Sequence, residues 1–348
     1  MKKIAFIFGG ISSEHEVSRI SVTSILNNVD KSKYEYIVVG ITKNGAWYKY
    51  TGDIKNIKGG EWEKDRDNLF DCVLSPDRRH SGFLVKKGDN WQTETVDVLF
   101  PVMHGQYGED GAIQGLFKLS GIPFVGCDLI SSANCMDKDI TKLILTANDI
   151  PNSKWITVYE GCDIASVDRN IIETLNYPVF VKPANSGSSV GVGKAYDSHE
   201  LAKCLEVAFK EDKKVIIEET IKGKEIECAV MGNDEPRAFE TLGEVEPLRD
   251  VYDYEGKYED NTTKLHIPAR LEDEQVQAVR DCAIKAYRAM GCKGLSRVDF
   301  FVTESGIVLN EINTLPGFTN ISMYPKLAME SGLSYSEVIS KLIELAKN

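Results

Sequence analysis

The sequence predicts an α/β fold divided among more than one domain, and three features carry this prediction. Its 348 residues exceed what one hydrophobic core usually organises. The N-terminus reads as an apolar strand, a Gly9-Gly10 turn and an amphipathic helix. Residues 96–103 form a nearly continuous apolar run, which is typical of a strand buried on both faces of a parallel sheet. In the C-terminal part, a hairpin between long helical segments indicates an α+β arrangement.

The first strand is expected at residues 4–8 and the first helix at 13–28, with Ser13 and Glu16 spaced as a capping box. The turn between them suits an anion or a small polar ligand. It lacks the GxGxxG spacing of a dinucleotide site. Glu14 falls in the first helical turn, where the helix dipole alone favours a carboxylate, so a binding role is one of two interpretations.

The apolar run 96–103 ends in the polar segment 104–111, and a helix is expected at 112–120. Ligands of open α/β sheets bind beyond the carboxyl ends of the strands. His104 is therefore a candidate binding residue, with a structural hydrogen bond as the alternative. The strand–helix alternation pauses near Cys127, and we place the end of an N-terminal α/β domain there, at 1–127.

A central lobe is predicted at residues 128–217. It begins with a helix that Ser131 or Ser132 would cap and that would reach Asn148, carrying Lys138 in the segment MDKD.

A glycine- and serine-rich segment follows the strand predicted at 177–183, which carries Lys182. Residues 185–193 contain three glycines and three serines, whose amides and hydroxyls could wrap phosphate oxygens. A plain hairpin loop is the alternative interpretation. The segment lacks the GxxxxGK[ST] order of a Walker site.

The C-terminal lobe is predicted at residues 218–348. It opens where the strand 215–220 changes abruptly from apolar residues to Glu218 and Glu219. These carboxylates could accept hydrogen bonds from ribose hydroxyls or an adenine amine, or they could cap the strand. Residues 244–264 combine charges and tyrosines without a period, and an irregular loop of about this length in a compact domain predicts an active-site lid.

Residues 296–318 predict a β-hairpin whose loop is Glu304-Ser305-Gly306, with Gly306 supplying a positive φ. Closing this loop with Thr303 opposite Ile307 fixes the register. The opposed polar pairs are then Asp299 with Glu311 and Arg297 with Asn313, on one face, and the apolar face carries Phe300, Val302, Val308 and Ile312.

The polar face of this hairpin predicts a magnesium site. Asp299, Glu311 and Asn313 offer only hard oxygen donors, which suit Mg²⁺ when substrate phosphates complete its shell. A pair of salt bridges on a solvated face is the alternative. The Pro316-Gly317-Phe318 turn that follows would direct backbone amides towards an anion.

Composition excludes several classes of partner. The net charge of −12 argues against broad binding to nucleic acid or to acidic membranes. No apolar stretch approaches the length of a membrane span. The eight cysteines show no CxxC pair or zinc spacing, so a cytoplasmic protein with reduced thiols is expected.

With these segments in place, the sequence resembles the D-alanine–D-alanine ligase family of ATP-grasp enzymes over nearly its whole length. The resemblance implies an ATP-grasp fold with an N-terminal open α/β preATP-grasp domain, and nucleotide held between the central and C-terminal lobes. The motifs that carry it are FGGISSEHEVS, MHGQYGEDGAIQG, CMDKD, VKPANSGSSVGV, YDYEGKY, GLSRVDF and LNEINTLPGFTNISMYP.

The resemblance also implies roles for individual residues. It gives the Mg²⁺ site, where Mn²⁺ can substitute, to Asp299, Glu311 and Asn313. It gives contacts with ATP to Lys138, Lys182, Ser189, Glu218, Glu219, Glu225, Lys257 and Asn310. The family usually has lysine where this chain has Glu219, so a side-chain contact at that position is in question and a backbone contact is the alternative.

On the substrate side, the resemblance places the ammonium group of the first D-alanine at Glu14, near His104. Glu14, Ser188 and Tyr258 would form a hydrogen-bonded trio that joins the lid to the other domains. Arg297 and the Gly317 amide match the oxyanion site, Ser322 matches a contact with the carboxylate of the acceptor, and Met323 lies beside it.

The implied reaction joins two D-alanines through an acyl phosphate, for peptidoglycan precursor synthesis. Tyr258 and the apolar Met323 favour D-alanine as acceptor, with D-serine as the alternative. Another ATP-grasp carboxylate–amine ligase and a catalytically silent nucleotide-binding module remain open as other classes. The resemblance further suggests a homodimer whose ligands are small molecules, D-alanine and ATP.

Overall fold

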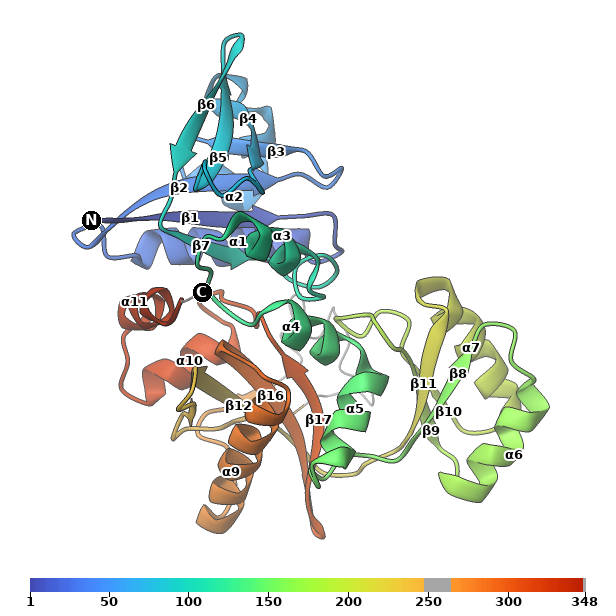
Figure 1. Ribbon diagram of the computed structural model, residues 1–348. Coiled ribbons are helices and arrows are strands. Elements are labelled where there is room, and N and C mark those ends of the chain that lie inside the picture. Colours follow the sequence, from blue (N-terminus) through green and yellow to red (C-terminus); the bar gives the residue numbers. More distant parts are fainter. Residues whose placement is uncertain (247–263, 347–348) are drawn as a thin grey trace.

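The computed structural model describes residues 1–246 and 264–346, which form three β-sheets with flanking helices. Figure 1 shows the first sheet above, the third below it, and the second to one side, with helices α4 and α5 between the second and third sheets.

The N-terminal sheet has seven strands in the order β6-β5-β4-β3-β2-β1-β7, and β1 runs parallel to both β2 and β7. Residues Ile4 to Phe8 of β1 are fully buried. Because β1 and β7 are parallel, the segments that follow them emerge at the same edge. The strands are β1 (Lys2–Gly9), β2 (Tyr34–Ile41), β3 (Trp47–Tyr50), β4 (Leu69–Leu74), β5 (Gly82–Lys87), β6 (Asn90–Thr95) and β7 (Val98–Val102), and the helices are α1 (His15–Asn28), α2 (Lys55–Gly59), η1 (Glu61–Lys64), η2 (Arg66–Asn68) and α3 (Ala112–Ser120).

The predicted capping box at the start of α1 is wrong. The helix begins at His15, Glu14 is its N-cap residue, and no side chain caps it. Instead, the Ser12 hydroxyl donates to the carbonyl of His104 (2.7 Å) and accepts from the Glu14 amide (3.1 Å). This arrangement ties the turn after β1 to the end of β7 and leaves the Glu14 carboxylate for a contact outside its own helix.

The second sheet is antiparallel, with the strand order β10-β9-β11-β8. Its apolar face is covered by α6 and α7, which share one core with it. The elements are β8 (Trp155–Tyr159), α6 (Ile164–Thr174), β9 (Val179–Pro183), β10 (Gly193–Ala195), α7 (Ser198–Glu211) and β11 (Lys214–Glu219). The boundary predicted between residues 217 and 218 falls inside β11, so we propose that this lobe extends to Glu219.

Two helices replace the single helix predicted up to Asn148: α4 (Leu129–Met136) and α5 (Lys138–Ala147). Asp128 and Asp137 cap them, rather than Ser131 or Ser132. Asp137 has an extended backbone, and its carboxylate accepts from two amides of the next turn, which ends one helix and starts another. Lys138 is thereby the first residue of α5.

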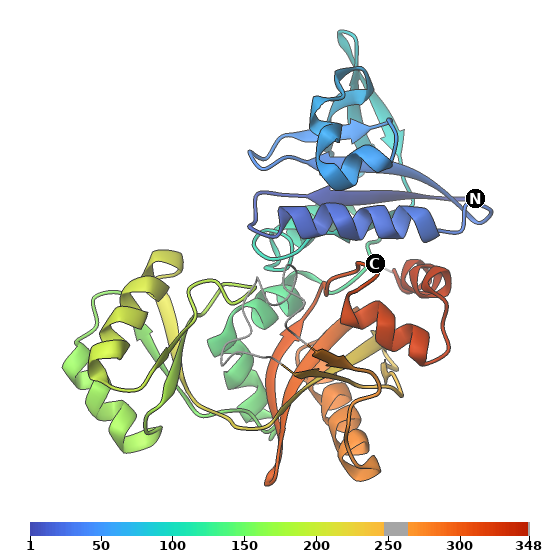
Figure 2. The ribbon, with the colours of Figure 1, turned by 180° about the vertical axis from the view of Figure 1, so that it is seen from behind.

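The third sheet has six strands, in the order β15-β14-β12-β16-β17 with β13 beside β12. Helix α9 covers its apolar face, whereas α10 and α11 pack with α1 and the first sheet in a common core. Figure 2 shows α10 and α11 below α1. The elements are β12 (Lys224–Gly232), β13 (Arg237–Ala238), β14 (Gly243–Glu246), β15 (Lys264–His266), α9 (Asp273–Ala289), β16 (Gly294–Thr303), β17 (Gly306–Asn313), α10 (Met323–Glu330) and α11 (Tyr335–Leu345).

The β16–β17 hairpin has the predicted polar pairs, but its loop is shorter than predicted and its second strand contains a bulge. Thr303 pairs with Gly306, so the loop has two residues rather than three. A β-bulge at Asn310 then shifts the register by one, which restores the pairing of Asp299 with Glu311 and of Arg297 with Asn313. The predicted place of Val308 on the apolar face is wrong: it pairs with Phe301, and Leu309 is fully buried instead.

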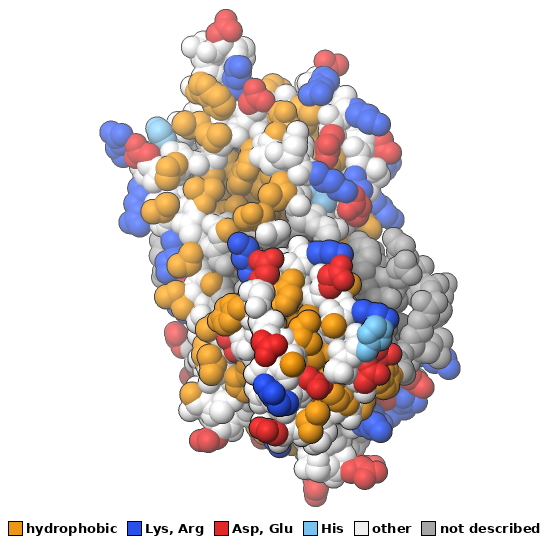
Figure 3. Space-filling model, turned by 90° about the vertical axis from the view of Figure 1, so that its right-hand side faces the viewer, with side chains coloured by type: hydrophobic (Ala, Val, Ile, Leu, Met, Phe, Trp, Pro, Cys, Tyr) orange, Lys and Arg blue, Asp and Glu red, His pale blue; other side chains and the backbone are white. Residues whose placement is uncertain are grey.

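The surface mixes both signs of charge. On the face seen in Figure 3, acidic and basic side chains are interspersed among apolar ones. Within residues 1–246 and 264–346, no helix is long and apolar enough to cross a membrane. All eight cysteines are free thiols.

Candidate active site

Two adjoining cavities of about 140 and 160 Å³ lie where the three sheets meet. Every predicted site residue within the described part of the chain lines one or both of them. The first cavity is lined by Glu14, His104, Asn313, Gly317, Ser322 and Met323, the second by Lys182, Ser189, Glu218, Glu219, Glu225, Asp299 and Asn310, and both by Lys138, Ser188, Arg297 and Glu311. Lys257, Tyr258 and most of the predicted lid lie outside the described residues.

The serine-rich segment between β9 and β10 is a compact turn that reaches the N-terminal domain. Ser188 and Ser189 both have a left-handed backbone, with φ of 50° and 58°. The Ser188 hydroxyl donates to Glu14 Oε1 over 2.6 Å. At its other side, Lys138 Nζ donates to the Ser186 carbonyl, also over 2.6 Å. Two of the three predicted members of the Glu14 trio are therefore in direct contact.

The Glu14 carboxylate fits against backbone that carries no side chain. Gly105 has a φ of +68°, and a Cβ at this position would lie 2.4 Å from Glu14 Oε2. Glycine at 105 thus serves both the turn and the close approach of the carboxylate.

The loop after β17 is held to the N-terminal domain through the backbone amide and the backbone carbonyl of Leu315. Its amide donates to Glu109 Oε1 (2.9 Å), and its carbonyl accepts from His104 Nδ1 (2.9 Å). The other ring nitrogen of His104 lies 3.1 Å from Ser21 Oγ, which accepts from the Phe318 amide. These contacts fix the backbone on both sides of Gly317. His104 therefore positions this loop as well as lining the cavity.

Burial shifts the pKa values of both His104 and Glu109. It lowers the pKa of His104, an effect that the nearby Glu14 carboxylate only partly offsets. The pKa of Glu109 rises to about 8, because burial and the charge of Glu14 outweigh the amides of Gly105 and Leu315. A neutral imidazole that donates from Nδ1 and accepts at Nε2 satisfies both of its contacts.

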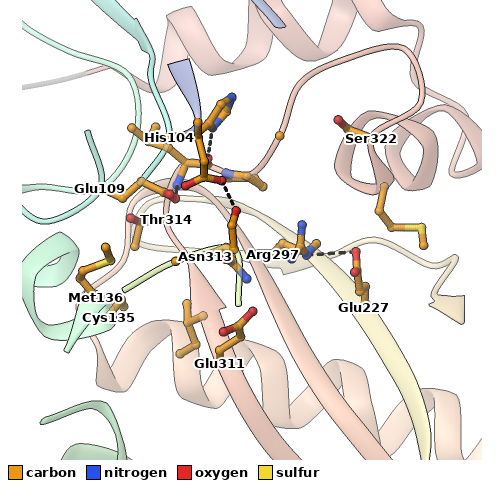
Figure 4. A pocket seen from close by; sticks show the side chains of 18 of the residues that line it. His104, Glu109, Cys135, Met136, Glu227, Arg297, Glu311, Asn313, Thr314 and Ser322 are labelled. Carbon is orange, nitrogen blue, oxygen red and sulfur yellow. Dashed lines mark hydrogen bonds and ion pairs between the residues drawn. The ribbon is translucent and has the colours of Figure 1, made fainter. Parts of the chain in front are cut away.

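Arg297 is held between two carboxylates. Its Nε and Nη2 atoms donate to the two oxygens of Asp299, each over 2.8 Å, and its Nε lies 3.0 Å from Glu227 Oε2. Asp299 and Glu227 together raise the pKa of Arg297, against the opposing effect of burial. Figure 4 shows Arg297 and Glu227 on one side of the cavity and His104 and Glu109 on the other, with Asn313 between them. The guanidinium is thus rigidly oriented at the junction of both cavities.

The predicted magnesium donors fit the chemistry of a hard divalent cation. In the described part of the chain, no three His, Cys, Asp or Glu side chains come together to hold a metal. The candidate set instead combines the carboxylates of Asp299 and Glu311, which are cross-strand partners, with the amide of Asn313. Asn313 Nδ2 donates to Asp299 over 3.0 Å, which leaves the amide oxygen as its metal donor.

The adenosine-side carboxylates have partners of their own. Glu218 Oε1 lies 2.6 Å from Lys142 Nζ, and Glu218 Oε2 lies 2.6 Å from Lys182 Nζ. Glu219 Oε1 accepts from the Lys154 amide over 2.8 Å, and the Glu219 amide donates to the Lys154 carbonyl over 3.1 Å. Both oxygens of Glu218 are thus paired with lysines, whereas Glu219 uses Oε1 to hold the Lys154 amide, as expected of a residue that caps the strand end.

Ser322 and Met323 form the start of α10, beside the first cavity. The Ser322 hydroxyl lies 2.8 Å from Thr319 Oγ1 and accepts from the Thr319 amide. Met323 packs against Gly243, where an added Cβ would lie 2.3 Å from the Met323 sulfur. The methionine is 6% exposed, so this wall of the cavity is apolar and closely packed.

Sequence reasoning missed Glu109 and Glu227, which line the cavities, and Lys142, which pairs with Glu218 behind them. Only Glu227 had a usable signal, since it is two residues from Glu225 and so shares one face of β12 with it. The structure pairs Glu227 with Asp299 on the neighbouring strand. The positions of Glu109 and Lys142 depend on contacts between segments that are distant in the chain.

Comparisons with known proteins agree along the whole chain. Residues 3–127 match the family model described as D-ala D-ala ligase N-terminus, and residues 144–344 match D-ala D-ala ligase C-terminus. The D-alanine–D-alanine ligase of Acetivibrio thermocellus is 50% identical over 363 residues, covering 99% of this chain and 96% of that protein. D-alanine–D-alanine ligase B of Clostridium tetani is 49% identical over 352 residues, covering 99% and 94%.

Solved structures extend this likeness. The VanG D-Ala:D-Ser ligase from Enterococcus faecalis aligns with a TM-score of 0.91 and 42% identity, covering 99% of each chain. The D-alanine–D-alanine ligase from Bacillus anthracis complexed with ATP aligns with a TM-score of 0.72 and 30% identity, covering 99% of this chain and 97% of that one.

Proposed function

Because the chain belongs to the D-alanine–D-alanine ligase family, we propose that it joins two D-alanines into D-alanyl-D-alanine with conversion of ATP to ADP and phosphate. The product would serve as a peptidoglycan precursor. The fold is the ATP-grasp fold predicted from the sequence, with an N-terminal α/β domain. The observation that carries the proposal is the convergence of Glu14, Ser188 and Arg297 on one cleft from three separate segments.

In the proposed reaction, the carboxylate of the first D-alanine attacks the γ-phosphorus of ATP, giving an acyl phosphate and ADP. The amine of the second D-alanine then attacks the acyl carbon, and phosphate leaves. The first step brings a carboxylate up to the polyanionic phosphates, and the second develops an oxyanion at the acyl carbon. The work of the protein is therefore to position the reactants and to supply positive charge.

The residues of the first cavity suit the substrate amino acids. The Glu14 carboxylate would bind the ammonium of the first D-alanine, and the hydroxyl of Ser188 holds one of its oxygens. Arg297 and the Gly317 amide would stabilise the oxyanion that develops at the acyl carbon. Because Asp299 and Glu227 fix the guanidinium, little reorganisation is needed when that charge appears. Ser322 would hold the carboxylate of the acceptor.

The residues of the second cavity suit the nucleotide. Lys138, Lys182 and Ser189 would bind phosphates, and Glu225 and Asn310 line the same cavity. Lys257, which lies outside the described residues, would also bind a phosphate. Mg²⁺, held by Asp299, Glu311 and Asn313, would supply positive charge that offsets the repulsion between the phosphates and the attacking carboxylate.

The direct test mixes the purified protein with ATP, Mg²⁺ and D-alanine, follows phosphate release, and identifies the dipeptide by mass spectrometry. We expect ADP, phosphate and D-alanyl-D-alanine in equal amounts, and none with L-alanine. ATP turnover that is independent of D-alanine would contradict the proposal, as would nucleotide binding without turnover.

D-serine is the second candidate acceptor, because the VanG D-Ala:D-Ser ligase resembles this chain over its whole length. The apolar Met323 beside Ser322 favours the methyl group of D-alanine over a hydroxymethyl group. Competition between equal concentrations of D-alanine, D-serine and D-lactate should give mainly D-alanyl-D-alanine. Mainly D-alanyl-D-serine would reverse the assignment.

Three finer parts of the proposal have different grounds: Mg²⁺ as the metal rests on the hard oxygen donors of the hairpin and on the family resemblance, a homodimer rests on the resemblance alone, and a cytoplasmic location rests on the scattered cysteines. Light scattering of the purified protein tests the second, with a mass near twice the 38.8 kDa of one chain expected and the mass of one chain contradicting it.

A further inference from the structure

Three charged side chains, those of Lys142, Lys182 and Glu218, form one ionic cluster at the wall of the second cavity. Glu218 is 3% exposed. Its Oε1 lies 2.6 Å from Lys142 Nζ, and its Oε2 lies 2.6 Å from Lys182 Nζ. Ser153 completes the group, because its hydroxyl donates to Glu218 Oε1 (3.0 Å) and accepts from Lys142 Nζ (2.7 Å). One buried carboxylate therefore bridges two lysines that come from different elements.

The two lysines differ in their access to the cavity. Lys182, on β9, lines it. Lys142, on α5, is 2% exposed and lines neither cavity, with Trp155 and Ser153 around its ammonium. Lys142 thus does not reach the cavity itself, and its effect on a ligand must pass through its neighbours Glu218 and Ser153, which line the cavity.

The charges of the group explain why a second lysine is useful. If Lys182 alone neutralised Glu218, its ammonium could turn to a phosphate only by leaving a buried carboxylate unpaired, which is strongly unfavourable. With Lys142 and Ser153 both on Oε1, Glu218 keeps two donors after Lys182 turns away. The burial of Glu218 acts to raise its pKa, but Lys182 and Lys142 outweigh that effect and lower it, so the carboxylate stays charged.

We propose that Lys142 is a positioning residue, which keeps Glu218 paired so that Lys182 can pass from Glu218 to a phosphate of the nucleotide. This inference rests on the proposed function, because it takes ATP as the ligand. It also gives Glu218 a different role from the adenosine contact expected from the sequence: the carboxylate pairs with Lys182 until a nucleotide phosphate replaces it.

The test measures the affinities for ATP, by calorimetry, and for adenosine, by NMR titration, in the full chain and in Lys142→Met. We expect the Kd for ATP to rise by about tenfold to a hundredfold, because Lys182 would have to abandon a buried carboxylate. Adenosine has no phosphate, so its Kd should stay within about twofold of that of the unaltered protein. Lys210→Met, which removes an exposed lysine paired with Glu206, is the matched control and should change neither.

A double variant sharpens the test. In Lys142→Met/Glu218→Gln the bridging group is uncharged, so Lys182 is no longer held and most of the ATP affinity should return. If Lys142→Met does not fold, Lys142→Arg and Lys142→Gln replace it, with ATP affinity kept in the first and lost in the second.

Several results would overturn the inference: unchanged ATP affinity in folded Lys142→Met, an equal loss for ATP and adenosine, or no recovery in the double variant. Each leaves the proposed function intact as long as the unaltered protein binds and uses ATP. Failure of the unaltered protein to do so would contradict the proposed function itself.

Discussion

Replacing Arg297 by alanine separates the chemical step from nucleotide binding. The guanidinium makes two 2.8 Å hydrogen bonds with Asp299 and lies 3.0 Å from Glu227, so its position at the junction of the cavities is fixed before substrate arrives. Removal of one such preorganised oxyanion donor lowers kcat by about a hundredfold to a thousandfold, or ~2.7–4 kcal/mol of transition-state stabilisation. Nucleotide affinity should survive, because the proposed phosphate contacts come from lysines and not from Arg297.

Arg297→Ala also strands two partly buried carboxylates, and loss of one partner of such a group costs about 3–5 kcal/mol of folding free energy. Thermal unfolding must therefore accompany the kinetics, and the assay temperature must lie well below the midpoint of the variant. Phosphate release at saturating ATP and D-alanine gives kcat, and calorimetry gives the Kd for ATP. Arg79→Ala, which removes an exposed arginine paired with Asp77, is the control. A folded Arg297→Ala enzyme whose kcat stays within about fivefold of the original would refute the oxyanion assignment.

Three further predictions concern residues near the Glu14 carboxylate. Ser188→Ala removes a 2.6 Å hydrogen bond to that carboxylate, and the KM for the first D-alanine should rise by about tenfold or more in steady-state kinetics, whereas an unchanged KM would argue against the contact. Gly105→Ala would place a Cβ 2.4 Å from Glu14 Oε2 at a φ of +68°, so both stability and D-alanine affinity should fall, and a fully active variant would contradict the fit. Burial raises the pKa of Glu109 to about 8, so between pH 4.5 and 8 the folded state binds more protons than the unfolded state. This carboxyl group therefore stabilises the folded state at low pH, and its contribution is lost as the pH rises through that window. Urea unfolding between pH 6 and 9 should show a weaker pH dependence in Glu109→Gln, and identical profiles would oppose this assignment.

The elements and the polar pairs of the hairpin could be predicted because they depend on local patterns. Alternation along β16 and β17 places Arg297 and Asp299 on one face whatever the loop is. The register near the loop could not be obtained in the same way. A three-residue loop and a two-residue loop followed by a bulge give the same pairing at Asp299, and nothing in the sequence around Asn310 distinguishes them. The error therefore affected Val308 and left the site intact.

The rest of the site depends on contacts between distant segments. Glu109 is 206 residues from Leu315, and Glu14 is 174 residues from Ser188. No local period reports such pairs, and the helix-dipole interpretation of Glu14 was sufficient for the sequence alone. Lys142 could not be predicted either, because a lysine on a helix is ordinarily solvent-exposed and its partner Glu218 is distant in the sequence.

The central claim is that the carboxylate of one D-alanine attacks ATP in this cleft, and an isotope-transfer measurement tests it most directly. D-alanine labelled with ¹⁸O in its carboxylate is incubated with the protein, ATP and Mg²⁺, and the released phosphate is analysed by mass spectrometry. An acyl phosphate intermediate requires one ¹⁸O atom in each phosphate formed alongside the dipeptide. Phosphate that carries no label, with the dipeptide formed in equal amount, would contradict the account.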